Sequence, residues 1–185
     1  MEPWGHWLTG GLLVRLPLAA VLMAVVMGLG ACSGSKSGAG YRYEYVRGRT
    51  ATLTRDGRAV APPGAPAAVR RAIQAGNEIC GKPYRRGGGH GRLHDTAYDC
   101  SGGASYVLNK AGLMKGSMPS GPFRHFGRRG HGRWIDVYAR QGHVFLVVAG
   151  LRFDTSTHGG REVGPRWTNR PRSTRQFVVR HPAGL

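Results

Sequence analysis

The fold is organised around residues 97–108, which read AYDCSGGASYVL. After the cysteine, apolar residues recur at three- and four-residue spacing as far as Ala111, which predicts an amphipathic helix that ends near Gly112. Cys100 therefore falls at or just before a helix N-terminus, where unpaired backbone N–H groups and the helix dipole favour a thiolate over a thiol. The position predicts a nucleophilic sulfur. The alternative is that Cys100 is only a small packing residue.

Composition limits the possible partners. The 185 residues suffice for one domain and a leader, and they carry 27 Lys and Arg against 9 Asp and Glu, for a formal net charge of +18. Such an excess predicts a polyanionic partner: nucleic acid, anionic lipid or an acidic cell-envelope polymer. Three cysteines are too few for a disulfide scaffold. The 31 glycines and 11 prolines predict short elements joined by many loops.

Residues 1–31 predict a secretory leader, because the apolar run over 16–27 is too short to span a membrane comfortably. The leader ends in LGAC at 29–32, which resembles the lipobox of bacterial lipoproteins. In that class the cysteine is lipidated, so we expect a lipid anchor at Cys32; an ordinary signal peptide is the alternative. Ser33 is not Asp, which predicts the periplasmic face of the outer membrane of a Gram-negative bacterium. An exported protein is not expected to bind nucleic acid.

The remaining chain divides into residues 32–65, read as a polar tether and a short hairpin, and residues 66–185, read as a catalytic domain. The tether is rich in Gly and Ser, and alternating tyrosines over 41–45 predict a short strand. Helical periodicity predicts a helix over 67–80. Strands are predicted over 134–138, 143–148, 152–154 and 176–180. Helices followed by antiparallel strands indicate an α+β domain.

The sequence disfavours a disulfide, a phosphate-binding loop and a zinc site. A Cys80–Cys100 disulfide would consume the proposed nucleophile, and Cys80 lies on the apolar face of its helix. The glycine-rich turn over 81–89 lacks the Gly-Lys-Ser/Thr of a phosphate-binding loop. His90 and His94 have a spacing that suits zinc on a helix, but glycines surround them. We predict neither a metal nor a cofactor.

The sequence offers a base for Cys100. His143 opens a predicted strand, and Asp154 follows eleven residues later, beyond a tight turn at 149–151. A hairpin of that size returns the chain beside its start, so Asp154 is expected to approach the His143 ring. A cysteine at a helix start, an imidazole at a sheet edge and a polar group that orients it form the arrangement of cysteine-nucleophile hydrolases. The predicted catalytic residues are therefore Cys100, His143 and Asp154.

Three motifs resemble the NlpC/P60 family of bacterial cell-wall peptidases. They are YDCSG at 98–102 before a small-residue helix, GHVFLVV at 142–148, and GKPYRRGG at 81–88. The resemblance covers roughly residues 66–180. It implies a papain-like α+β fold, with N-terminal helices packed on a small antiparallel sheet. It also implies cleavage of peptide bonds in peptidoglycan stem peptides, commonly between D-glutamyl and diaminopimelate or lysine residues.

By the same resemblance, Cys100 is the nucleophile, with a backbone N–H that helps to bind the oxyanion, and His143 is the general base and acid. Tyr84, Asp99 and Ser101 would line the substrate subsite, with Asp99 suited to a free amino group of the stem peptide.

The chain also departs from the family pattern. The third catalytic position is more often His than Asp, and His158 is a second candidate for that role. Gly103 stands where a bulky apolar residue is usual, and Arg86 where an aromatic residue is frequent. These last two departures concern substrate preference.

The sequence thus predicts a lipid-anchored peptidoglycan endopeptidase of the D,L type. One alternative is an amidase or acyltransferase on the same scaffold, because a Cys-His-Asp set serves any acyl transfer. The other is a non-catalytic anchored protein whose basic loops bind anionic envelope polymers or lipopolysaccharide. The same basic loops also fit a simpler role as a solvated surface.

Overall fold

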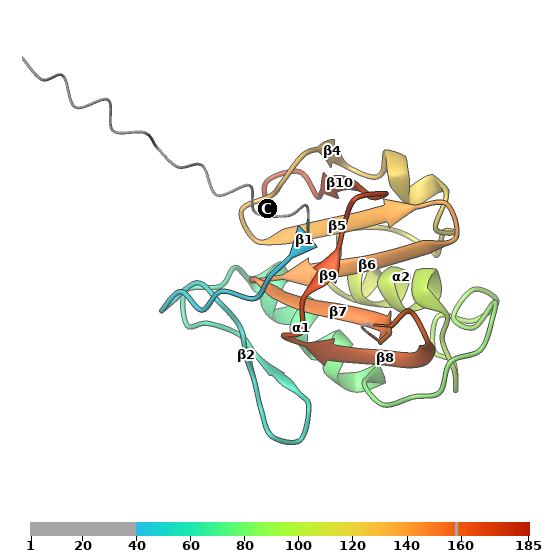
Figure 1. Ribbon diagram of the computed structural model, residues 1–185, viewed down its shortest axis with the longest axis horizontal. Helices are drawn as coiled ribbons and strands as arrows, with labels where there is room; N and C mark the ends of the chain where they lie inside the picture. Colours follow the sequence, from blue (N-terminus) through green and yellow to red (C-terminus); the bar gives the residue numbers. More distant parts are fainter. Residues whose placement is uncertain (1–39, 158) are drawn as a thin grey trace, which may run out of the picture. The chain divides into compact units, whose positions relative to one another are not determined.

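The computed structural model describes residues 40–157 and 159–185, in which two α-helices pack against a β-sheet (Figure 1). The early elements are β1 (Gly40–Tyr41), β2 (Thr52–Leu53), β3 (Ala59–Val60), α1 (Ala67–Ile79), α2 (Cys100–Lys110) and the 3-10 helix η1 (Pro122–His125). The later strands are β4 (Arg128–Arg129), β5 (Ile135–Arg140), β6 (His143–Val148), β7 (Leu151–Ser156), β8 (Glu162–Thr168), β9 (Arg172–Ser173) and β10 (Val178–His181). No helix in this part of the chain is long and apolar enough to cross a membrane.

The main sheet has six antiparallel strands in the order β4-β10-β5-β6-β7-β8. Two smaller ladders join β1 to β9 and β2 to β3. The turn between β6 and β7 consists of Ala149 and Gly150, both with positive φ. Positive φ at both central residues is what a tight hairpin turn requires, because it matches the twist of the flanking strands. This turn returns β7 alongside β6 and fixes which of their side chains meet.

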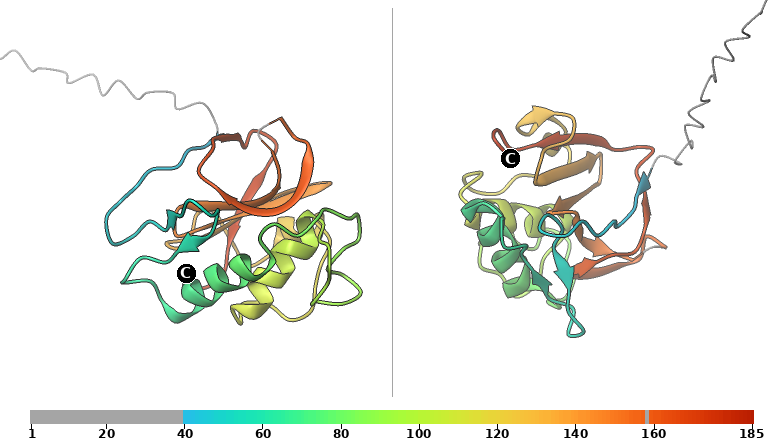
Figure 2. Two further views of the ribbon diagram at one scale, coloured as in Figure 1. Left: turned by 90° about the horizontal axis from the view of Figure 1, so that it is seen from below. Right: turned by 90° about the vertical axis from the view of Figure 1, so that its left-hand side faces the viewer.

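The two faces of the sheet have different surroundings. Figure 2 shows α1 and α2 together on one face. Alternating residues of β6 (Val144, Leu146 and Val148) join this main core, while Phe145 and Val147 belong to a smaller cluster with Tyr41 and Tyr138. Because successive side chains of a strand point to opposite faces, His143 of β6 lies on the second face. The helix face therefore supplies the core, and the second face is free to hold polar groups.

Sequence and structure agree on the mixed helix-and-sheet composition. The helix predicted over 67–80 is α1, which ends one residue earlier, and the strand predicted over 143–148 is β6. The strand predicted over 41–45 is restricted to β1. Strand β8 was not predicted, because its sequence EVGPRWT contains a Gly-Pro pair that is typical of a turn. The leader, the tether as far as residue 39 and the lipidation candidate Cys32 lie outside the described residues.

Candidate active site

Cys100 is the first residue of α2. The preceding Asp99 is the N-cap, and its Oδ1 atom accepts a hydrogen bond of 2.7 Å from the backbone N–H of Gly102. This cap satisfies one donor of the first turn and fixes where the helix begins. The sulfur consequently lies at the positive end of the helix dipole. Cys100 is 8% exposed and lines a cleft of about 560 Å³.

The glycine-rich loop before the cysteine packs directly on the first turn of α2. The backbone N–H of Asp99 donates to the carbonyl of Gly88 at 3.2 Å, and that of Gly87 donates to Asp99 Oδ2 at 2.9 Å. A Cβ atom at Gly102 would overlap the carbonyl oxygen of Gly88. The close approach explains the glycine at position 102 and holds the loop beside the cysteine.

His143 and Asp154 form a buried pair on the second face of the sheet. His143 Nε2 lies 3.0 Å from Asp154 Oδ1, and their side chains are 4% and 0% exposed. Ser156 also holds this carboxylate, because its backbone N–H and its hydroxyl donate to the same Oδ1 atom at 3.1 and 3.2 Å. The expected approach of Asp154 to the imidazole is therefore present in the geometry.

Electrostatics keep the imidazole of this pair protonated. Burial acts to lower the pKa of His143, but its contacts with Asp154, Cys100 and Glu162 outweigh burial and raise it to about 10. Burial acts to raise the pKa of Asp154, but the hydrogen bond from His143 and the nearby positive charges lower it. At neutral pH the pair is thus an imidazolium and a carboxylate.

The second ring nitrogen of His143 is the one left for Cys100. Nε2 is committed to Asp154, so Nδ1, which also lies 3.4 Å from Glu162 Oε1, is the atom available to the Cys100 thiol, a hydrogen-bond partner of the ring. A cysteine sulfur beside an imidazole is the pairing that nucleophilic catalysis by cysteine uses. The structure thus brings together all three residues predicted as catalytic.

Sequence analysis missed Glu162, the first residue of β8. Its Oε1 atom lies 3.4 Å from His143 Nδ1, and its Oε2 atom accepts a hydrogen bond of 2.9 Å from Thr155. The side chain is 31% exposed, so the carboxylate borders both the imidazole and solvent. No sequence signal marks this residue, because it belongs to a strand that reads as a turn.

Two arginines also went unpredicted as neighbours of Asp154: Arg152, which is buried, and Arg172, which is partly buried. The Asp154 Oδ2 atom lies 3.0 Å from Arg172 Nη1 and 3.4 Å from Arg152 Nη1. Arg172 reaches Asp154 from β9, and its Nη1 atom also donates to the Ser156 hydroxyl at 2.6 Å. The carboxylate that faces His143 is therefore held by guanidinium groups on its far side.

The predicted substrate residues Tyr84, Asp99 and Ser101 line the same cleft as Cys100. Burial, reinforced by the negative charges of Glu162, Cys100 and Asp99, raises the pKa of Tyr84 to about 12, so its hydroxyl remains a donor. His90 lines this cleft too, and its Nε2 atom lies 3.1 Å from both Asp99 Oδ1 and Ser101 Oγ. His90 thus belongs to the subsite, a placement that the sequence did not indicate.

The structure also bears on the disulfide and zinc sites that sequence analysis disfavours. Cys80 and Cys100 are both free thiols, and Cys80 Sγ lies 3.5 Å from the Gly57 carbonyl. His94 packs edge-on against Tyr106 rather than pairing with His90. Within residues 40–157 and 159–185, no group of three or more His, Cys, Asp or Glu side chains is arranged to hold a metal. His158, the second candidate for the third catalytic role, lies outside the described residues.

Comparison with known proteins adds one similarity of fold. No protein-family model and no curated protein matches the chain. Among solved structures, the chain is similar to the P60 domain of an antigen from M. avium subspecies paratuberculosis. The identity is 20% and the TM-score 0.40, over 61% of this chain and 93% of that domain. A similarity of this size assigns no function, so the function must be argued from the site itself.

Proposed function

We propose that this protein is a cysteine peptidase of the NlpC/P60 type that cleaves peptide bonds in peptidoglycan stem peptides. The observation that carries the proposal is the buried line from Asp154 through His143 to Cys100, which ends at a helix N-terminus in a cleft wall. These are the parts that acyl transfer by a thiolate requires: a nucleophile, an acid and base, and a group that orients the imidazole. The three sequence motifs supply the substrate class.

In the proposed reaction the Cys100 thiolate attacks the carbonyl carbon of the scissile peptide bond. The negative charge that develops on the carbonyl oxygen is stabilised by the backbone N–H of Cys100. His143 then gives its Nδ1 proton to the leaving amine, and the peptide C–N bond breaks to leave a thioester on Cys100. Water attacks this thioester after giving a proton to Nδ1, and the thiolate leaves. Asp154 keeps the ring oriented throughout, because it holds Nε2.

The subsite that we propose for the stem peptide is built from Tyr84, Asp99 and Ser101. A free ammonium group fits beside Asp99, whose carboxylate faces the cleft. His90 already contacts both Asp99 and Ser101, so an incoming ammonium must share or replace these contacts. Arg86 lines the same cleft and offers a cation for a substrate carboxylate.

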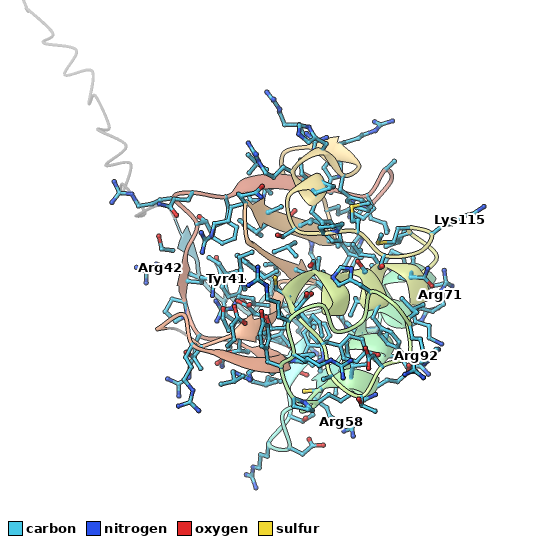
Figure 3. All side chains as sticks on the ribbon, turned by 90° about the vertical axis from the view of Figure 1, so that its right-hand side faces the viewer. Tyr41, Arg42, Arg58, Arg71, Arg92 and Lys115 are labelled. Atoms are coloured by element: carbon cyan, nitrogen blue, oxygen red, sulfur yellow. The ribbon has the colours of Figure 1, made fainter. Side chains whose placement is uncertain are left out.

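For the cellular setting we propose the cell envelope, with a lipid anchor at Cys32 that holds the protein on the periplasmic face of a Gram-negative outer membrane. This part rests on the sequence alone. The net charge of +18 supports additional attraction to anionic envelope polymers or lipopolysaccharide. Figure 3 shows the basic residues Arg71, Arg92 and Lys115 on one side of the view, with Arg42 on the opposite side and Arg58 at the bottom. Mass spectrometry of the mature N-terminus tests the anchor, since a lipidated Cys32 has a characteristic added mass.

The decisive experiment uses purified sacculi and defined muropeptides. The chain and its Cys100→Ala variant are incubated with them, and the products are weighed by mass spectrometry. Cys80→Ala is the matched control, because it removes the other described cysteine without touching the cleft. New stem-peptide fragments with the unsubstituted chain and Cys80→Ala, but not with Cys100→Ala, are expected. Products of transfer to another amine would favour the acyltransferase alternative, and release of intact stem peptide from the glycan would favour the amidase alternative. Salt-sensitive retention on sacculi without cleavage by any form would favour the anchored binder.

A further inference from the structure

A second cavity of about 630 Å³ lies apart from the Cys100 cleft. It is built mainly from β7, β8 and the residues that follow β8. Its polar lining includes Arg152, Ser156, Arg166, Thr168, Asn169 and Arg170. Strand register places Arg152 opposite Thr168, and Arg166 opposite Asp154. Directly opposite residues of an antiparallel pair project to the same face, so these groups share the sheet face that lies away from the helices.

The most unusual member of this lining is Arg152. It is 1% exposed, and although its Nη1 atom lies 3.4 Å from Asp154 Oδ2, neither Nη1 nor Nε makes a hydrogen bond within residues 40–157 and 159–185. Its guanidinium carbon lies 5.7 Å from the centre of the Tyr41 ring and 5.9 Å from that of Phe145. The two aromatic rings attract the positive charge of the guanidinium group, but they do not replace the oxygen acceptors that its N–H groups require. A buried guanidinium with unused donors is costly to the folded protein unless a further acceptor reaches it.

The charges around Arg152 also indicate that its surroundings suit an anionic group. The nearby Asp154 carboxylate is shared among Arg152, Arg172 and His143. The cavity adds the guanidinium groups of Arg166 and Arg170, and no Asp or Glu stands among its described lining residues. Positive charge therefore exceeds negative charge at this place, and the hydroxyls of Ser156 and Thr168 provide neutral hydrogen-bonding groups beside it.

We propose that this cavity binds a phosphoryl group carried on a molecule larger than phosphate itself. Convergent arginines and hydroxyls suit a phosphoryl group, whose oxygens accept several hydrogen bonds at once. The cavity volume is in the range of sites for small organic ligands and leaves room beyond the phosphoryl group. The proposal is independent of the peptidase activity. The phosphoryl group can come from a soluble phosphate ester or from a phospholipid headgroup, and the experiment distinguishes these sources.

The test is calorimetric titration of the full chain with inorganic phosphate, at an ionic strength matched with sodium chloride. We expect saturable binding with one site per chain. Arg166→Gln and, separately, Arg170→Gln are expected to weaken binding by at least about tenfold each, because each removes one charged donor. Neither substitution replaces a fully buried side chain, so both variants are expected to fold. Arg128→Gln, an exposed position on β4 outside the cavity, is the control with the same loss of charge.

Two competition experiments identify the kind of molecule that carries the phosphoryl group. Glycerol 3-phosphate should displace phosphate from the site. If phosphatidylglycerol vesicles displace it as well, and Arg166→Gln reduces that displacement, the ligand is a lipid headgroup; if only the soluble ester does, the ligand is soluble. The proposal is overturned by non-saturable uptake, by phosphate binding no better than chloride, or by equal weakening in Arg128→Gln and Arg166→Gln. Such results would mean diffuse attraction to a protein of charge +18.

Discussion

Replacing Asp154 by Asn perturbs the candidate site while nearly preserving its shape. The Asp154 side chain is fully buried, accepts from His143 and Ser156 through one oxygen, and faces Arg172 and Arg152 with the other. An amide has no charge, and its NH₂ group cannot accept from the cations that it would face. Removal of one partner from a buried ionic group commonly costs about 3–5 kcal/mol in the free energy of unfolding. We expect a loss of that size at neutral pH.

The pH dependence of this loss separates the His143 contribution from the arginine contribution. The pKa of His143 in the folded protein is about 10, above its ordinary value of 6.5. Its stabilisation is therefore complete below the unfolded pKa and is lost as the pH rises through the folded pKa. In Asp154→Asn the imidazolium loses its main partner, so this contribution is small at every pH. The difference in stability between the two proteins should consequently shrink from neutral to strongly alkaline pH, while the arginine part persists.

Urea unfolding of the chain and of Asp154→Asn, at several values between about pH 6.5 and 10.5, measures this difference. NMR titration of the His143 ring should show a lower pKa in the variant. Asp136→Asn is the matched control, because Asp136 also pairs with an imidazole, that of His131, at 2.8 Å. His131 is 67% exposed, so this loss should stay within about 1 kcal/mol. A cost for Asp154→Asn below about 1 kcal/mol, or one that does not change with pH, would refute this account of the buried pair.

Four other substitutions and an alkylation experiment test the site. Gly102→Ala should destabilise the protein by about 1–3 kcal/mol, because its methyl group would overlap a backbone oxygen. Its neighbour Gly103→Ala should be neutral or stabilising in thermal unfolding, since the nearest atom lies 3.7 Å from the new methyl group. Glu162→Gln should lower the pKa of His143 in an NMR titration, because the carboxylate raises it; an unchanged value would remove Glu162 from the electrostatics of the site. Iodoacetamide at pH about 6 should alkylate Cys100 about tenfold faster than Cys80, and His143→Ala should abolish this preference.

The positions of Cys100, His143 and Asp154 are predictable from sequence because each lies beside a strong local signal. Helical periodicity places Cys100 at the start of α2, and the apolar run of β6 begins at His143. The short turn at Ala149 and Gly150 then sets the register that brings Asp154 near the ring. Each of these placements lies within one helix or one hairpin, where local propensity and side-chain period suffice, whereas the pairing of Cys100 with His143 is expected from the arrangement of cysteine-nucleophile hydrolases.

The other residues that surround Cys100, His143 and Asp154 reach them through contacts between segments that are distant in the sequence. Glu162 belongs to β8, whose Gly164-Pro165 pair reads as a turn, and its pairing with β7 includes a register shift beside Ser156. Arg172 comes from β9, which is ordered by pairing with β1 rather than by its own sequence. His90 lies in a glycine-rich loop whose course depends on packing against α2. No periodicity encodes such placements, so sequence analysis does not locate Glu162, Arg172 or His90 in the site.

The contacts of His143 also bear on how one imidazole can serve both halves of the proposed reaction. Its pKa of about 10 suits an acid that gives a proton to an amine, but is high for a base that must take one from water. Cys100 is one of the groups that raise this pKa, and acylation converts its sulfur into a neutral thioester. The pKa of His143 should therefore fall in the acyl-enzyme, when the ring is needed as a base. Glu162 takes no part in the acylation, so its contact with His143 should limit how far the pKa falls and would link β8 to the rate of deacylation in the proposed reaction.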